Sequence, residues 1–230
     1  FETIQKAVDN KKPIIVEKPI AHNLDDARKI VQLDRSTDVP IAIAEQWVYF
    51  KAVYLIKERL DKIGPVVSFT YRSSGPVNST SKYLATSWRQ KPEHIDGYLS
   101  DGGVHQLALL TEVLGPVKSV SALTKQVREE SGDVDILFST TKLDSGVIGT
   151  FTYGSAFGAI EKHGSFIIYG VNGSITFDFS AGKPRSIKTL VGPLANEIKD
   201  EEFLEFEEAN AFASEFENFY ESVVKNDKKL

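Results

Sequence analysis

The stretch "IIVEKPIA", residues 14–21, joins a short apolar run to an acid, a base and a proline. The apolar run is typical of a buried β-strand. Glu17, Lys18 and Pro19 cannot continue it, because proline lacks a backbone donor and unpaired charges are excluded from a core. The sequence therefore predicts a strand that ends at Glu17 and places Lys18 at its carboxyl end. A cis Lys18–Pro19 peptide bond is compatible with this turn.

Residues 1–46 around this strand alternate between helical and strand-like patterns. Apolar residues at helical spacing predict helices before residue 10 and over residues 22–34, the second capped by Asn23. The run "VPIAIA", 39–44, is a second fully apolar strand, as in α/β proteins with parallel sheets. Two strands are few for a parallel sheet, which suggests the C-terminal part of a longer protein; a small α/β lobe is the alternative. The sequence has no G-x-G-x-x-G.

After residue 47 the pattern changes to α+β. A helix is predicted over residues 49–62, another over 104–114, and an amphipathic last helix over 209–226. The turn signals "LDSG", 143–146, and "VNGS", 171–174, separate β-type runs and indicate a mostly antiparallel sheet with helices on one face. The runs cover residues 66–74, 117–127, 134–143, 146–157, 164–170, 173–180 and, more weakly, 185–192.

The composition limits the classes of function. The 230 residues carry a net charge of -5 with no basic cluster, which argues against a nucleic-acid partner. The absence of cysteine excludes disulfides, zinc–thiolate sites and a cysteine nucleophile, and no metal site is predicted. No apolar run approaches the roughly 18 residues of a membrane span. We expect a cytoplasmic protein that does not bind membranes.

Two clusters could carry chemistry. Ligands of open parallel sheets bind beyond the carboxyl ends of the strands, so Lys18 should face a crevice, although a strand-end lysine is often only a surface charge. In "DGGVHQ", 101–106, Asp101 and His105 are four residues apart at a predicted helix start and share one face. A carboxylate beside an imidazole fixes its tautomer. The structural alternative is an N-cap aspartate and a packed histidine.

The pair Trp88–Arg89 lies in a polar, irregular stretch. An indole and a guanidinium there could stack on a base or hold a phosphate. A surface loop pinned by one tryptophan explains the pair equally well.

Taken together, these motifs resemble the Gfo/Idh/MocA family, the relatives of glucose–fructose oxidoreductase and inositol dehydrogenase. The matching stretches run in family order along nearly the whole chain, and E-K-P followed by D-x-G-x-H is fairly specific. They are A-x(5)-P-I-I-V-E-K-P-I-A at 7–21, G-P-V at 64–66, W-R at 88–89, D-x-G-V-H at 101–105, L-G at 114–115, G-x-x-G-S-I at 170–175 and A-F-x-x-E-x-x-N-F at 211–219.

The resemblance implies two domains and a redox reaction. Residues 1–46 would be the C-terminal remnant of a dinucleotide-binding Rossmann domain, and residues 47–230 the substrate and oligomerisation domain. Hydride would pass between a nicotinamide cofactor, NADP or alternatively NAD, and a small hydroxyl or carbonyl compound. Lys18, Asp101 and His105 would be catalytic, with Asp101 holding His105. The cofactor cleft would be lined by Glu17, Lys18, Gln46, Trp88 and Arg89.

One departure concerns the substrate. Many members read H-x-x-D, whereas Ala108 stands three residues after His105. The missing acid usually contacts a sugar or polyol hydroxyl, so the resemblance implies a less polar carbonyl compound.

Two other functions remain open. One is a non-catalytic sensor or transcriptional co-regulator that binds the dinucleotide, and the other is an interaction module built on the exposed sheet. The run 147–157 has a second, partly apolar face that helices cannot also cover. Self-association through this open sheet is therefore expected.

Overall fold

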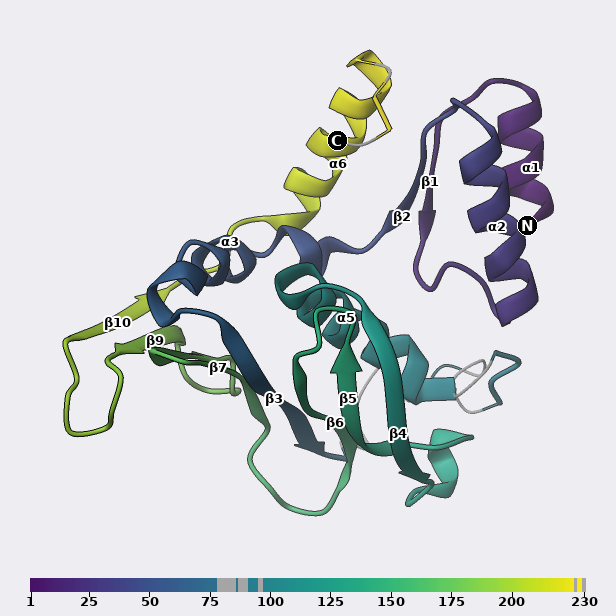
Figure 1. The fold of residues 1–230 in the computed structure, drawn as a ribbon. Coiled ribbons are helices and arrows are strands. Elements are labelled where there is room, and N and C mark those ends of the chain that lie inside the picture. The colour runs from purple at the N-terminus through teal and green to yellow at the C-terminus, as the bar shows by residue number, and fades with distance from the viewer. Residues whose placement is uncertain (78–85, 87–90, 95–96, 226, 229–230) are drawn as a thin grey trace.

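The computed structural model describes residues 1–77, 86, 91–94, 97–225 and 227–228. Figure 1 shows a small N-terminal lobe beside a larger part built on one twisted sheet. The lobe contains α1 (Glu2–Asp9), β1 (Ile14–Glu17), α2 (Leu24–Ser36) and β2 (Ile41–Ala44).

The lobe follows the helix–strand–helix–strand order that the sequence predicts. β1 and β2 pair in parallel with Glu17 opposite Ala44, so both strands end at the same edge. The Asn23 side chain accepts a hydrogen bond of 2.8 Å from the Asp26 backbone N–H, which confirms it as the cap of α2. The Lys18–Pro19 bond is cis. Since β1 ends at Glu17, Lys18 is the first residue beyond the sheet.

The larger part is an eight-stranded sheet in the order β10-β9-β8-β7-β3-β6-β5-β4. Among the described strands only β3 and β6 pair in parallel within it, which confirms the mostly antiparallel α+β prediction. Its strands are β3 (Val66–Pro76), β4 (Val117–Lys125), β5 (Ile136–Leu143), β6 (Ile148–Phe157), β7 (His163–Gly170), β8 (Gly173–Asp178), β9 (Arg185–Val191) and β10 (Asp200–Phe206).

The acidic strand β10 was missed by the sequence reading. It pairs with β9 at the edge of the sheet, where its carboxylates meet cations from neighbouring elements. Lys188 lies 2.7 Å from Glu201, and Glu202 pairs with Arg59. An edge strand tolerates such charge because one side remains open to solvent.

Helices lie over one face of the sheet. Those that pack on it are α3 (Lys51–Lys57), α5 (Gly97–Leu114) and the 3-10 turn η2 (Leu60–Ile63). Helix α6 (Ala211–Lys225) extends away from the sheet and contacts the 3-10 turn η1 (Gln46–Tyr49) (Figure 1). A further 3-10 turn, η3 (Glu129–Ser131), follows β4. The single helix predicted over residues 49–62 is wrong, because Phe50 is extended and separates η1 from α3. Glu208 then caps α3, accepting from the Lys51 backbone N–H at 2.7 Å.

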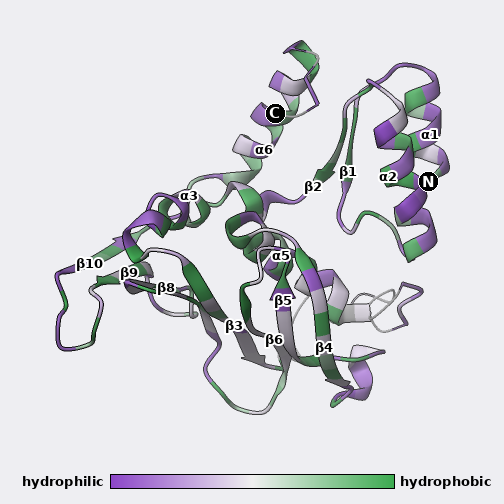
Figure 2. Ribbon diagram, viewed as in Figure 1, coloured by the Kyte–Doolittle hydropathy of each residue, from purple (hydrophilic) through white to green (hydrophobic). Residues whose placement is uncertain are grey.

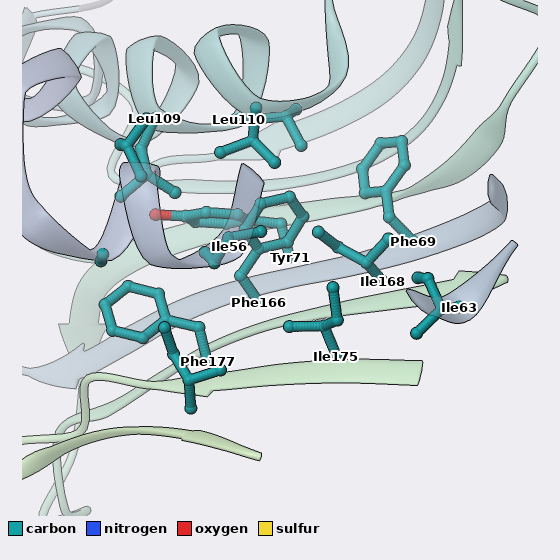
Figure 3. Close-up of a cluster of buried hydrophobic side chains, with 14 of the residues drawn as sticks. Ile56, Ile63, Phe69, Tyr71, Leu109, Leu110, Phe166, Ile168, Ile175 and Phe177 are labelled. Atoms are coloured by element: carbon teal, nitrogen blue, oxygen red, sulfur yellow. The ribbon is translucent and has the colours of Figure 1, made fainter. Parts of the chain in front are cut away.

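The main core lies between this sheet face and helices α3 and α5. Figure 3 shows Leu109 and Leu110 above Tyr71, Phe69 and Phe166, all of them buried. The Tyr71 hydroxyl donates a 2.6 Å hydrogen bond to the Gln106 side-chain oxygen, so the one polar group of this ring is satisfied. The core therefore fixes the rotation of α5 about its axis, and with it the direction of the opposite face of that helix.

The two faces of β6 differ as its alternating pattern predicts. Phe151 is 4% exposed beneath the helices, whereas Ile148 on the other face is 57% exposed. Other large apolar side chains on that outer side and on the edge strand β4 are also exposed: Val120, Leu123, Phe138 and Phe203. Figure 2 shows the hydrophobic (green) stretches on β4. The outer face of the sheet is an open and partly apolar surface.

Candidate active site

Lys18 reaches from the end of β1 to helix α5. Its amine donates hydrogen bonds of 2.8 Å to the Asp101 carboxylate and 2.8 Å to the Asp101 backbone carbonyl. The two side chains are only 16% and 11% exposed. Lys18 is therefore one member of a partly buried ion pair, and the alternative that it is only a surface charge does not hold.

Asp101 lies inside α5 and not at its N-cap, because the helix begins at Gly97. Its carboxylate is bound to Lys18, and the His105 ring is held by Glu45 instead. The expectation that Asp101 orients His105 is therefore wrong. Although the i,i+4 spacing puts both side chains on one face of α5, the ammonium group from β1 is the partner of the aspartate.

Glu45 is the residue that sequence reasoning missed. It follows β2 directly, and its Oε1 lies 2.7 Å from His105 Nδ1. The same oxygen accepts from the Trp47 backbone N–H at 3.1 Å. Because β1 and β2 are parallel, the strand-end argument that selected Lys18 applies equally to Glu45.

The contacts of His105 define its hydrogen-bonding roles. A carboxylate can only accept, so Nδ1 carries the proton donated to Glu45, and Nε2 is the nitrogen left for another partner. The Trp47 ring stacks on the imidazole at a centroid distance of 5.5 Å and an angle of 15°. Stacking and hydrogen bond together fix the orientation of the ring.

A second carboxyl, that of Glu215, is influenced by the charge of Glu45. Glu215 on α6 is 3% exposed. Burial raises the pKa of the Glu215 carboxyl, and the charges of Glu45 and Glu17 raise it further, against the lowering effects of the Glu45 backbone N–H and of His105. Burial also raises the pKa of the neighbouring Tyr49 hydroxyl, which donates a 2.8 Å hydrogen bond to Asn218.

The glycine pair of α5 makes room for a ring from β6. A Cβ on Gly102 would lie 2.1 Å from the Tyr153 hydroxyl, and one on Gly103 would lie 3.5 Å from the same ring. Gly102 therefore accommodates Tyr153. A pocket of about 250 Å³ adjoins this contact, lined by Pro19, Leu99, Ser100, Gly103, Val104, Leu107, Leu137, Phe151 and Tyr153.

The other predicted site residues are placed as follows. Glu17 is exposed at the last position of β1, and Gln46 is half-buried at the start of η1. Ala108 is half-buried one turn after His105 on α5. Trp88 and Arg89 lie outside the described residues, so their predicted role stays a prediction.

Within the described part of the chain, no group of three histidine, aspartate or glutamate side chains could hold a metal ion. Nor does any helix formed by the described residues have the length and apolar character needed to cross a membrane.

Comparison with protein families gives a match over most of the chain. Residues 57–230 match the model described as "Oxidoreductase family, C-terminal alpha/beta domain". The chain is 51% identical to the Uncharacterized protein YMR315W of Saccharomyces cerevisiae, over all of this chain and 66% of that protein. It is 29% identical to Dehydrogenase FPY6 of Fusarium mangiferae, over 97% of this chain and 64% of that protein. The chain thus spans about two thirds of the length of these relatives.

Solved structures share the fold. An oxidoreductase of Thermotoga maritima, TM0312, superposes with a TM-score of 0.81 at 28% identity, over 98% of this chain and 66% of that one. Levoglucosan dehydrogenase, solved in complex with NADH, superposes with a TM-score of 0.80 at 17% identity, over 98% and 68%. At that identity the second comparison supports the fold alone.

Proposed function

The chain belongs to the Gfo/Idh/MocA oxidoreductase family. On this premise we propose that it is part of an NAD(P)-dependent dehydrogenase or reductase that acts on a small hydroxyl or carbonyl compound. In this proposal residues 1–46 complete a dinucleotide-binding Rossmann domain, and residues 47–230 form the substrate domain.

One observation carries the proposal. The carboxyl ends of β1 and β2 each send one polar side chain to the same face of α5, where Lys18 meets Asp101 and Glu45 meets His105. Asp101 and His105 are one helical turn apart on α5, so the amine and the imidazole are each held by a separate carboxylate at the same face of this helix. Proton transfer to or from a reacting oxygen requires such positioned groups.

The roles of the two groups follow from charge. When hydride leaves a carbinol carbon, the oxygen loses its proton, and in reverse the oxygen gains negative charge. The Lys18 ammonium, held by Asp101, would stabilise that charge more in the transition state than in the ground state. His105 would exchange the proton through Nε2, because Glu45 occupies Nδ1. Asp101 would then position Lys18 rather than His105.

The site suits the nicotinamide end of a dinucleotide. Lys18 and Glu17 stand at the strand end, where α/β folds bind such ligands, and Gln46 begins the turn after β2. When bound, the cofactor would accept the hydride in oxidation and supply it in reduction. We propose that Trp88 and Arg89 also line the cofactor cleft. We propose NADP as the cofactor, with NAD as the alternative.

Ala108 bears on the substrate class. It shares the α5 face of Asp101 and His105, and its methyl group offers no hydrogen bond to a substrate hydroxyl. A carbonyl compound less polar than a polyol fits this face better.

The test is stopped-flow hydride transfer on the whole protein, beside dinucleotide titrations. Lys18→Ala should lower the rate about 10²–10⁴-fold, the usual cost of losing a general acid or base, with little change in dinucleotide affinity. The matched control is Lys29→Ala, which removes an exposed lysine of α2. If Lys18→Ala and His105→Ala both kept the wild-type rate, the catalytic assignment would be refuted and the sensor function favoured.

A further inference from the structure

An apolar pocket begins beside the ion pair of Lys18 and Asp101. Pro19, which directly follows Lys18, and Ser100, which directly precedes Asp101, both line it. The pocket has a volume of about 250 Å³. A cavity of about 150 Å³ lined by leucine, isoleucine and phenylalanine accommodates benzene, so this pocket has room for a small ring or a branched hydrocarbon chain.

The lining offers few polar groups to a ligand. Among the described lining residues, only Ser100 and Tyr153 have a side chain with a polar atom. The Ser100 hydroxyl donates a 3.1 Å hydrogen bond to the Gly97 carbonyl of its own helix. The Tyr153 hydroxyl lies against α5, 2.1 Å from the point where a Cβ on Gly102 would stand. A polyol would bring several hydroxyl groups into this pocket, and burying them without partners is unfavourable.

The apolar lining continues along α5 toward the catalytic groups. Leu107 and Ala108 follow Val104 by three and four residues, so the three side chains are neighbours on the helix surface. Ala108 is also three residues after His105. The surface of α5 therefore changes from apolar at Val104 and Leu107 to polar at Asp101 and His105, with Ala108 between them.

We propose that this pocket is a specificity subsite for the hydrocarbon part of the substrate, a carbonyl or hydroxyl compound with a small ring or branched chain and few hydroxyl groups. The reacting oxygen would lie at the Lys18 amine while the hydrocarbon substituent occupies the pocket. Leu107 lines the pocket and is 42% exposed, so a ligand would remove apolar surface from water, which is favourable. This deepens the proposed function and rests on it for the reaction, but binding to the pocket is measurable without turnover.

Methyl NMR of the whole protein, titrated with cyclohexanol and with myo-inositol, tests the subsite directly. The two probes have the same carbon ring, but inositol carries a hydroxyl group on every carbon. Cyclohexanol should shift the Leu107 and Leu137 methyl signals, also in the presence of the reduced dinucleotide, with which an alcohol cannot react. Inositol should leave them unchanged. Failure of cyclohexanol to shift these signals, an equal shift by inositol, or exclusion of cyclohexanol by the dinucleotide would overturn the proposal.

Two leucine variants locate the binding. Leu107→Asn should weaken cyclohexanol binding about fivefold or more, because an amide replaces apolar lining. Since Leu107 is partly exposed, the substitution is compatible with folding. The matched control is Leu24→Asn, at an exposed leucine of α2, which should bind cyclohexanol as the wild type does. Equal affinities of Leu107→Asn and wild type would place the probe elsewhere and overturn the proposal.

Hydride transfer separates this proposal from the proposed function. With cyclohexanone and the reduced dinucleotide, Leu107→Asn should raise KM with little change in kcat, because a contact remote from the reacting atoms is made equally in the ground state and the transition state. A lower kcat with unchanged KM would overturn the subsite. Cyclohexanol binding without any hydride transfer would refute the proposed function and leave the subsite standing, and hydride transfer without cyclohexanol binding would do the reverse.

Discussion

Strands β1 and β2 of the N-terminal lobe are more apolar in sequence than β7 and β8 of the large sheet, but they are less deeply buried. Ile168 and Ile175 of the large sheet are fully buried. By contrast, every residue of β2 is only half-buried, and Glu17 of β1 is exposed. In the large sheet, β7 and β8 each pair with a strand on both sides and helices pack on one face, whereas β1 and β2, among the described residues, pair only with each other.

This difference separates the residues that stabilise the fold from the residues that are candidates for catalysis. The large core is apolar and lies under α3 and α5, whereas the lobe approaches the rest of the chain through polar contacts. These contacts join Lys18 to Asp101, Glu45 to His105, and Lys228 to the Asp34 carboxylate and Thr37 carbonyl, each at 2.7–2.8 Å. The candidate catalytic groups are therefore in the junction and not in the core.

The largest expected effect tests the core against the lobe. Phe166→Ala should lower the free energy of unfolding by about 3–5 kcal/mol, because it leaves a cavity between sheet and helices. Val16→Ala in half-buried β1 should cost about 1 kcal/mol, since less apolar surface is lost. Urea unfolding of the 230-residue chain, in which β1 has the burial described, measures both. Equal losses would show that the lobe is as tightly packed as the sheet.

The next effect concerns the junction. Glu45→Gln replaces a charged acceptor of His105, and hydrogen bonds to charged groups contribute about 1.5–3 kcal/mol. If that energy positions the ring in the transition state, the rate of hydride transfer should fall about 10–10²-fold.

Asp101→Asn provides the contrasting variant. It should weaken the hydrogen bond that positions the Lys18 amine and leave the NMR signals of the His105 ring unchanged, because the two pairs are separate. A change in the His105 ring signals of Asp101→Asn alone would support a pairing of Asp101 with His105.

The open face of the sheet predicts self-association. We expect the whole protein to form a dimer at micromolar concentration, and Ile148→Lys to weaken it at least tenfold, since a charge would be placed in an apolar contact. Val31→Lys, on an exposed apolar residue of α2, is the matched control. Sedimentation equilibrium measures the constants. A strictly monomeric wild type would refute the interface.

The smallest expected effect is the dependence of stability on pH. Burial first, then nearby carboxylates, raises the pKa of the Glu215 carboxyl above its usual 4.5. The folded chain then holds this proton more tightly than the unfolded chain, so the contribution is complete below pH 4.5 and is lost as pH rises through the raised value. Glu215→Gln should flatten that fall in urea midpoint. A wild-type slope in Glu215→Gln would contradict the raised pKa.

Much of the fold was predictable from local sequence. The Asn23 cap, the hairpin turn at 143–146, and the alternation of Ile148 and Phe151 each depend on neighbouring residues, and the structure agrees with all three. The break between η1 and α3 was not predictable, because its cap is Glu208, more than 150 residues away. The helix predicted from residue 104 begins at Gly97 instead. Glycines weaken a helical pattern in the sequence, but in the structure Gly102 leaves the space that the Tyr153 ring occupies.

The candidate site shows the same division. The apolar run before Glu17 and the proline after Lys18 place the lysine at a strand end, because proline cannot continue the ladder. Helical spacing likewise places Asp101 and His105 on one face. The sequence does not show which carboxylate contacts Lys18 and which contacts His105, because the partners lie on elements that are remote in sequence. Only the packing of β1 and β2 against α5 brings Lys18 to Asp101 and Glu45 to His105, across 83 and 60 residues of chain.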